Sequence, residues 1–262
     1  MSPGANYGFF QQFEAWVAHK FGLRRSCIKK FHIVGNIFYH KTFPIDQPAI
    51  PLRPVSDSST NEIKTSILQR AMDMFQRYGL RAMTMDDVCR ELSMSKKTLY
   101  QYFSNKADLV DQAVRHVFGA HKVAMDQLSA EHENAIDRMI HRFAFLMKMM
   151  ESHGPNMMFP LKKYYPKTFD WLFEQRQRTM QNALTQTIKD GQAQRLFRED
   201  LDPELVARIH FTTMVGLADG ELQSESLAER RELIWTAIAL FIRSISTAQG
   251  LHYFNEIKDS KR

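Results

Sequence analysis

The hydrophobic positions along this chain recur at the spacing of α-helices, and no alternating pattern runs long enough to predict a β-strand. Residues that start and stop helices support the same division, since Asp202 is placed to cap a helix that begins at Pro203. The sequence therefore predicts an all-α fold, with long helices over residues 107–129, 134–152, 167–190, 203–219 and 227–248.

Shorter helices precede these long ones. A first helix is predicted to end at Gly79, because glycine readily terminates a helix. Thr84 and Asp87 have the spacing of a capping box that opens a second, short helix. After a tight turn, Ser95 is placed to cap a third helix of about two turns over 96–103.

Composition permits a globular protein, because 262 residues with 44% hydrophobic content can bury a core. The net charge is +6, but residues 1–55 carry seven Lys and Arg against two Asp and Glu, a balance of +5. Only +1 remains for the rest of the chain, so a nucleic-acid contact there would need a local basic patch.

Two cysteines, Cys27 and Cys89, are too few for a disulfide framework or a zinc cluster, and they suit a reducing compartment. No stretch reaches the ~20 apolar residues of a spanning helix, and the amino terminus lacks the features of a signal peptide. We therefore expect a cytoplasmic location.

The residue spacing does not support catalysis. Several histidines lie close together in the sequence with Glu131, but they do not match the HExxH spacing of a metal-binding helix. No paired carboxylates, Gly-rich phosphate loop or nucleophile elbow occur either. We expect no enzyme activity, no cofactor and no metal site.

The third short helix has two chemically distinct sides. Leu99 and Phe103 point the same way and would anchor the helix to a core. The opposite arc offers groups that contact phosphates and base edges in a DNA major groove. A solvated surface would look similar in isolation, but a helix, a turn and a second short helix form the arrangement that lays the second helix in a major groove.

Residues 63–117 resemble the DNA-binding domain of the TetR family of bacterial transcriptional regulators. The residues that carry the resemblance are Ala71, Phe75, Thr84, the run Ser95-Lys-Lys-Thr-Leu-Tyr-Gln-Tyr-Phe103, Asn105, Lys106 and Leu109. The resemblance implies a helix-turn-helix domain over 61–118. Over 119–262 it implies a helical domain that binds a small-molecule effector and forms a homodimer, with 1–60 left as an irregular basic extension and Pro-rich linker.

The resemblance also implies which residues contact DNA. Lys106 has independent physical support, because a cation in the first turn of a helix is disfavoured unless an anion such as phosphate lies near. The implied contacts are Thr98, Tyr100 and Tyr102 facing the duplex, Lys96, Lys97 and Gln101 in base readout, and Thr84, Ser95 and Lys106 at helix starts.

Two positions depart from the family pattern. Ser93 stands where the turn residue is commonly glycine, so a left-handed backbone there would carry a strain of about 1 kcal/mol. Cys89 stands where a small alanine is usual. A redox-sensing role for Cys89 is one interpretation, but sensor cysteines need exposure and a cationic setting, so we expect a buried, inert thiol.

The amino-terminal 55 residues have no place in the family pattern. Their basic character would suit an arm that touches DNA backbone or minor groove. We favour the hypothesis that most of this segment is an over-extended reading frame, absent from the native protein or disordered, with a true start near Val55.

The last long helix carries an apolar stripe that includes Ile234, Ile238, Phe241, Ile242 and Ile245. The helix before it is apolar around most of its circumference, with Leu205, Val206, Ile209, Phe211, Met214, Val215 and Leu217. Apolar helices near a chain end commonly pack against a partner subunit, so we expect a homodimer interface here. Burial within the monomer is the alternative. Two subunits would place their recognition helices about one DNA turn, ~34–36 Å, apart.

Methionine and aromatic residues are concentrated in the middle helices, where their adaptable side chains would suit a pocket for an apolar or cationic effector. Ordinary core packing is the alternative. Arg176 and Arg178 would instead favour an anionic effector, unless they are solvated. The pocket candidates are Phe143, Met147, Met150, Tyr164, Tyr165, Phe169, Phe173, Met180 and Phe211.

These features predict a sequence-specific DNA-binding transcriptional regulator. We expect a repressor that a small-molecule effector releases from a palindromic double-stranded operator. An effector-independent regulator, or an activator with the same fold, is the alternative that the sequence leaves open.

Overall fold

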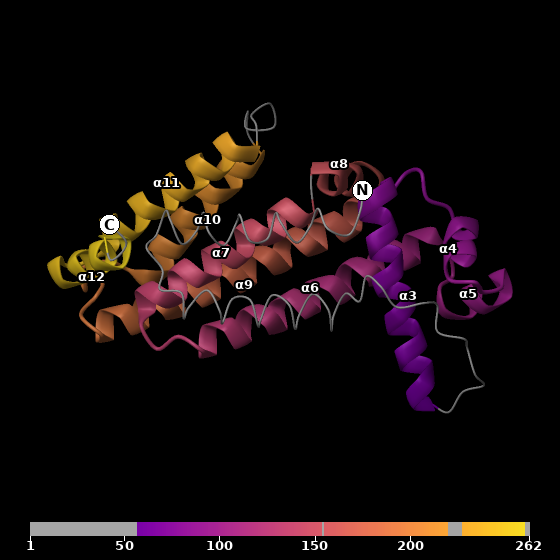
Figure 1. The fold of residues 1–262 in the computed structure, drawn as a ribbon, viewed down its shortest axis with the longest axis horizontal. Coiled ribbons are helices and arrows are strands. Elements are labelled where there is room, and N and C mark those ends of the chain that lie inside the picture. Colours follow the sequence, from indigo (N-terminus) through magenta and orange to yellow (C-terminus); the bar gives the residue numbers. More distant parts are fainter. Residues whose placement is uncertain (1–56, 154, 220–226, 260–262) are drawn as a thin grey trace. The chain divides into compact units, whose positions relative to one another are not determined.

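The computed structural model describes residues 57–153, 155–219 and 227–259, and Figure 1 shows them as helices joined by turns. Within these residues the β-type pairing consists of one isolated bridge, between Phe197 and Ser246. The predicted all-α fold is confirmed. None of the described helices is both long enough and apolar enough to span a membrane.

The five long helices predicted from the sequence correspond to α6, α7, α9, α10 and α11, with ends that agree to within a few residues. The sequence does not predict α8 or α12. In chain order the helices are α3 (Asp57–Tyr78), α4 (Met85–Glu91), α5 (Lys96–Tyr102), α6 (Lys106–Ala130), α7 (Ala135–His153), α8 (Pro155–Tyr164), α9 (Pro166–Ala193), α10 (Pro203–Asp219), α11 (Leu227–Ile245) and α12 (Ala248–Asp259).

Local chemistry explains where the helices differ from expectation. α8 begins at Pro155 and contains Pro160, and prolines normally interrupt a helical pattern; the first is tolerated because the first helical N–H has no intrahelical partner. α11 ends at Ile245 rather than at residue 248, because Thr247 caps α12 by accepting a hydrogen bond from the Gly250 N–H at 3.1 Å.

The Pro-rich linker that is expected to reach residue 60 ends earlier than predicted, since Asp57 to Thr60 already belong to α3. Asp, Ser and Thr are favoured at helix starts, so a polar cluster can open a helix as well as form a linker. The rest of that linker and the basic extension lie outside the described residues.

Packing divides the chain into two units, which are described separately. The amino unit contains the described residues of Phe43–Gln127 together with Leu146–Met180, and the carboxyl unit contains Leu128–Phe145 together with the described residues of Gln181–Arg262. α6, α7 and α9 each contribute residues to both units. The boundary predicted at residue 118 stays a prediction.

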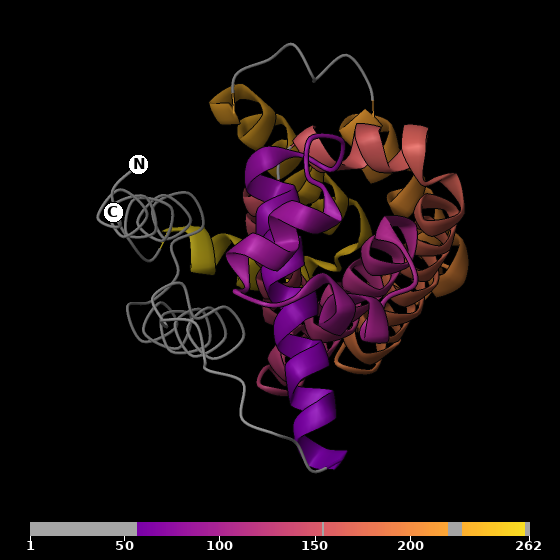
Figure 2. The same cartoon turned by 90° about the vertical axis from the view of Figure 1, so that its right-hand side faces the viewer.

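The core of the amino unit is built on α3, which buries Ala71 and Phe75 one turn apart. The ribbons of α3, α4 and α5 are gathered together in both views (Figures 1 and 2). Later helices complete this core: α8 packs against α3, and Met157, Leu161 and Leu172 belong to the same cluster of buried side chains.

In the carboxyl unit the apolar stripe of α11 faces inward. Ile234, Ile238, Ile242 and Ile245 are buried, and Trp235 is buried beside them. The expectation that this stripe forms a subunit interface is therefore wrong, and the alternative of burial within the monomer is correct. α11 lies beside α10 in this unit, so its isoleucines are needed to close the monomer's own core.

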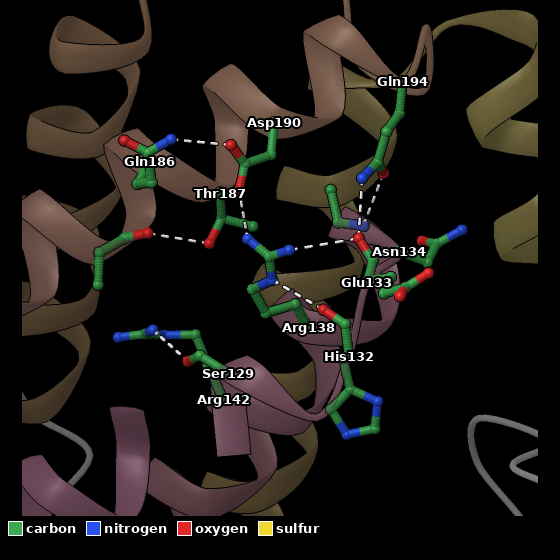
Figure 3. Close-up of polar contacts among 12 residues, drawn as sticks. Ser129, His132, Glu133, Asn134, Arg138, Arg142, Gln186, Thr187, Asp190 and Gln194 are labelled. Carbon is green, nitrogen blue, oxygen red and sulfur yellow. Dashed lines mark hydrogen bonds and ion pairs between the residues drawn. The ribbon is translucent and has the colours of Figure 1, made fainter. Parts of the chain in front are cut away.

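A polar network joins the turn between α6 and α7 to α9 (Figure 3). The guanidinium of Arg138 pairs with Asp190 and donates to main-chain oxygens of the turn at 3.0 and 3.2 Å. Gln194 accepts from the N–H of Ala135 at 2.9 Å and donates to the carbonyl of Glu133 at 2.8 Å. Side chains from α7 and the end of α9 thus satisfy backbone groups that a turn would otherwise leave unpaired.

His210 on α10 is a buried, neutral histidine. Its ring lies between those of Phe143 and Phe241, with centroids 5.0 and 3.9 Å away. Burial lowers the pKa of His210 from its ordinary value of 6.5 to about 4. Between these values the unfolded chain binds a proton that the folded chain does not, so the stability from this site is lost as the pH falls.

We expect His210→Leu to flatten the dependence of stability on pH. In the parent protein this histidine should remove about 1.5 kcal/mol of unfolding free energy between pH 6.5 and 5, and urea unfolding across that interval measures the slope. His252→Leu is the control, because His252 is exposed. His116 and His141, whose pKa values burial also lowers, keep part of the slope in every variant. An unchanged slope in His210→Leu would contradict the assignment.

Candidate nucleic-acid interface

α4 begins with the capping box that the sequence predicts. Thr84 accepts a hydrogen bond from the Asp87 N–H at 3.2 Å, and the Asp87 carboxylate accepts one from the Thr84 N–H at 2.9 Å. The Asp87 carboxylate also accepts a hydrogen bond from the Thr84 hydroxyl at 2.7 Å, and the two bonds that it accepts from Thr84 hold its pKa below the ordinary value. The helix is only seven residues long, so the cap and the buried Val88 fix its direction.

The turn between α4 and α5 requires one left-handed residue. Ser93 has a φ of 50°, which is the left-handed conformation that favours glycine. The strain expected for a left-handed backbone at this position therefore applies. The N–H of Met94 bonds to the carbonyl of Cys89 at 3.0 Å, which closes the turn.

Cys89 is buried at the helix crossing, and burial raises the pKa of its thiol. A raised pKa disfavours the reactive thiolate, as expected for an inert cysteine.

α5 presents a polar face above two anchored residues. Leu99 and Phe103 are completely buried, with 0% of each exposed. Tyr100 is 49% exposed, and Lys97 and Gln101 are exposed beside it. The helical positions thus divide as the sequence predicts, although contact with nucleic acid stays a prediction.

The start of α5 is held by two side-chain contacts. Ser95 accepts a hydrogen bond from the Thr98 N–H at 3.0 Å, which confirms the predicted cap. Lys96 forms an ion pair with Asp86 of α4 at 2.8 Å, and this partner raises the pKa of Lys96. Sequence reasoning missed Asp86, because the pair joins two helices through a turn of uncertain geometry.

Lys106 lies at the first position of α6 and reaches back to the loop after α3. Its Nζ donates to the carbonyl of Arg81 at 3.3 Å, and burial lowers its pKa. The helix start is capped by Asn105, which accepts from the Asp108 N–H at 3.0 Å. Lys106 therefore holds a partly desolvated charge at a helix start, where an added anion would be favourable.

The remaining contact candidates occupy intermediate positions. Tyr102 is half-buried, with its ring centroid 6.3 Å from that of Phe103. Thr98 is also half-buried, and its hydroxyl lies 2.8 Å from that of Ser95. Thr84 is exposed. All nine predicted contact residues lie in the amino unit, on α5 or at the starts of α4, α5 and α6.

The nine pocket candidates do not fall in one unit. Phe143 and Phe211 are buried in the carboxyl unit, and the others belong to the amino unit. On α9 Phe169 stacks on Phe173 with centroids 6.3 Å apart. Of the others, Met147 is buried, Tyr165 and Met180 are half-buried, and Tyr164 is 42% exposed. The side chain of Met150 lies outside the described part.

Comparisons with known proteins agree with this arrangement. Residues 67–113 match the sequence model of the bacterial regulatory proteins described as the tetR family. The HTH-type transcriptional repressor KstR2 of Mycolicibacterium smegmatis is 24% identical over 215 residues, which cover 76% of this chain and 98% of that protein.

Solved structures show the same fold. A transcriptional regulator from Cytophaga hutchinsonii superposes with a TM-score of 0.63 at 17% identity, covering 72% of this chain and all of that one. A TetR-family regulator from Pectobacterium atrosepticum gives a TM-score of 0.59 at 16% identity, covering 74% of this chain and 98% of that one.

We expect Ser93→Gly to stabilise the protein by about 0.5–1 kcal/mol, because glycine adopts positive φ without a Cβ clash. Ser93→Ala is the matched control, since it keeps the Cβ and therefore the strain. Urea unfolding of both variants measures the difference. An equal gain from the alanine variant would show that the left-handed backbone is not the cause.

Proposed function

Since the match over residues 67–113 makes the chain a member of the tetR family of bacterial regulatory proteins, we propose that it is a DNA-binding repressor that a small-molecule effector releases from a palindromic operator. The observation that carries the proposal is the exposed polar face of α5, fixed above buried Leu99 and Phe103. Its relative KstR2 is named as a repressor, which favours repression. The proposed role is regulatory rather than catalytic, and its target, the DNA operator, lies in the cytoplasm.

The two kinds of DNA contact fall to different parts of the interface. Thr84 and Lys106 lie at helix starts, where a positive dipole and side-chain donors suit phosphate oxygens. Lys97 and Gln101 are exposed on α5, where they would reach base edges in a major groove. A phosphate that approaches Lys96 would compete with the Asp86 carboxylate.

An ion pair between α3 and α4 helps to position the interface. Arg70 of α3 pairs with Glu91 at the end of α4 at 2.5 Å. Both side chains are about one-third exposed, so the pair contributes modestly to stability. The pair restricts the orientation of α4 relative to α3. Because a short turn joins α4 to α5, it also restricts the orientation of α5.

Exposed apolar residues of α10 and α11, rather than the buried stripe of α11, support a homodimer interface. Leu205 and Ile209 are exposed one turn apart on α10, and Leu233 and Leu240 are exposed two turns apart on α11. With α10 and α11 side by side, these leucines and isoleucine would meet the same residues of a second copy in a four-helix arrangement.

We expect Lys106→Ala to weaken binding to any duplex by about tenfold and to reduce the dependence on salt, because it removes a phosphate contact from each subunit. Gln101→Ala should instead change which bases are preferred. Fluorescence anisotropy with operators selected from random duplexes measures both. Lys122→Ala is the control. Lys122 is exposed, pairs with Asp126, and lies on α6 about 24 Å along the helix from Lys106. Full affinity in a Tyr100→Ala, Lys106→Ala double variant would overturn the assignment of the interface.

We expect Leu240→Glu to raise the dimer dissociation constant by at least about tenfold, because it places a charge in the apolar contact. Leu240 is 61% exposed, so the monomer should fold normally. Analytical ultracentrifugation measures the change. Val123→Glu is the matched control, because Val123 is exposed on α6. Equal effects of the two substitutions would argue against this dimer face.

A further inference from the structure

Arg176 on α9 is a half-buried arginine without a carboxylate partner among the residues that the structure describes. Its Nη1 lies 3.8 Å from the sulfur of Met158 on α8, and burial lowers the pKa of the guanidinium. A thioether is a weak acceptor, so this contact replaces little of the lost hydration. The amino unit thus holds a partly desolvated cation with no described anion to neutralise it.

Arg178, two residues further along α9, shows the ordinary alternative. It is exposed and donates to Glu174 at 2.7 Å, as a surface arginine does. The sequence predicts the same two alternatives for both arginines, solvation or contact with an anionic effector. The structure separates them, because Arg178 is solvated and paired whereas Arg176 turns toward α8.

Three of the four positions on α9 that lie one turn from Arg176 are apolar, and the fourth is Thr179. Leu172 and Phe173 precede it, and Met180 follows it. Met158, on the facing helix, adds a flexible and polarisable side chain. A fixed cation bordered by adaptable apolar groups suits a ligand with a charged head and an apolar body.

We propose that Arg176 binds the oxyanion head of an amphipathic effector, whose apolar body lies against α8 and α9. A guanidinium donates two parallel hydrogen bonds to a carboxylate or phosphate, which a point charge such as lysine does not match. The inference deepens the proposed function above and rests on it for the ligand's role as an effector.

The surroundings of this site connect it to the DNA-binding helices. Met157 and Leu161, on either side of Met158 along α8, are buried in the same core as Phe75 of α3. Leu172, one turn before Arg176, belongs to that core as well. An anion that draws Arg176 away from Met158 therefore repacks α8 against α3, and the effector lowers DNA affinity through this contact.

Calorimetric titration of the DNA-free, full-length protein tests the binding site. The probes are decanoate and decyl phosphate, with decan-1-ol as the neutral analogue. Both anions should bind the parent, bind Arg176→Met at least about tenfold more weakly, and bind the control Arg178→Met as tightly as the parent. Neither substitution should change the affinity for decan-1-ol. The proposal is wrong if neither anion binds the parent, or if Arg176→Met keeps full affinity.

Thermal unfolding separates a ligand-binding role from a structural one. Without ligand, Arg176→Met should melt about 2–4 °C higher than the parent, because it removes an uncompensated charge. A lower melting temperature would show that Arg176 stabilises the fold and would contradict the proposal.

Operator binding gives the regulatory readout. Decanoate should weaken operator binding by the parent but not by Arg176→Met, and the two proteins should bind DNA equally without it. Equal weakening in both would refute Arg176 as the effector contact. If the parent bound no duplex at all, the proposed function would be wrong. The calorimetric titration would still show whether Arg176 binds an anion.

Discussion

The burial of Leu99 and Phe103 is the contact on which the rest of the interface depends. α5 has seven residues, too few to be stable alone, so its orientation comes from the buried side chains of Leu99 and of Phe103, the residue that follows its last turn. Rotation of the helix by a single position, 100°, would turn Lys97 and Gln101 away from their present exposed direction. The hydrophobic contact therefore determines which polar groups are available, although it contains none of them.

Polar contacts then restrict the groups that the core has oriented. The Lys96–Asp86 pair and the Lys106 contact with the Arg81 carbonyl are both near the surface, where such interactions contribute little to stability. Their effect is to limit the conformations of two long side chains before any ligand arrives. Ordering that is already present in the free protein does not have to be supplied on binding.

The sequence predicts features that depend on residues three or four positions apart. The caps at Thr84 and Ser95 and the two faces of α5 are of this kind, and the structure reproduces them. Features that join distant segments were not predictable, including the ion pair of Lys96 and the different surroundings of Arg176 and Arg178. The stripe of α11 shows the same limit, because periodicity identifies an apolar face but not whether the same chain or a second copy covers it.

The part that α8 and α9 play in the amino core also concerns how such regulators can be recombined. Met157, Leu161 and Leu172 fill the core around α3, yet they follow the end of α6 in the sequence by more than 25 residues. The DNA-reading part is consequently not a contiguous block of sequence. A chimera that joined α3 to α6 to a foreign effector domain would lose these side chains and leave part of the core uncovered. Exchange of specificity between related proteins should therefore succeed at the exposed face of α5 rather than at a boundary between domains.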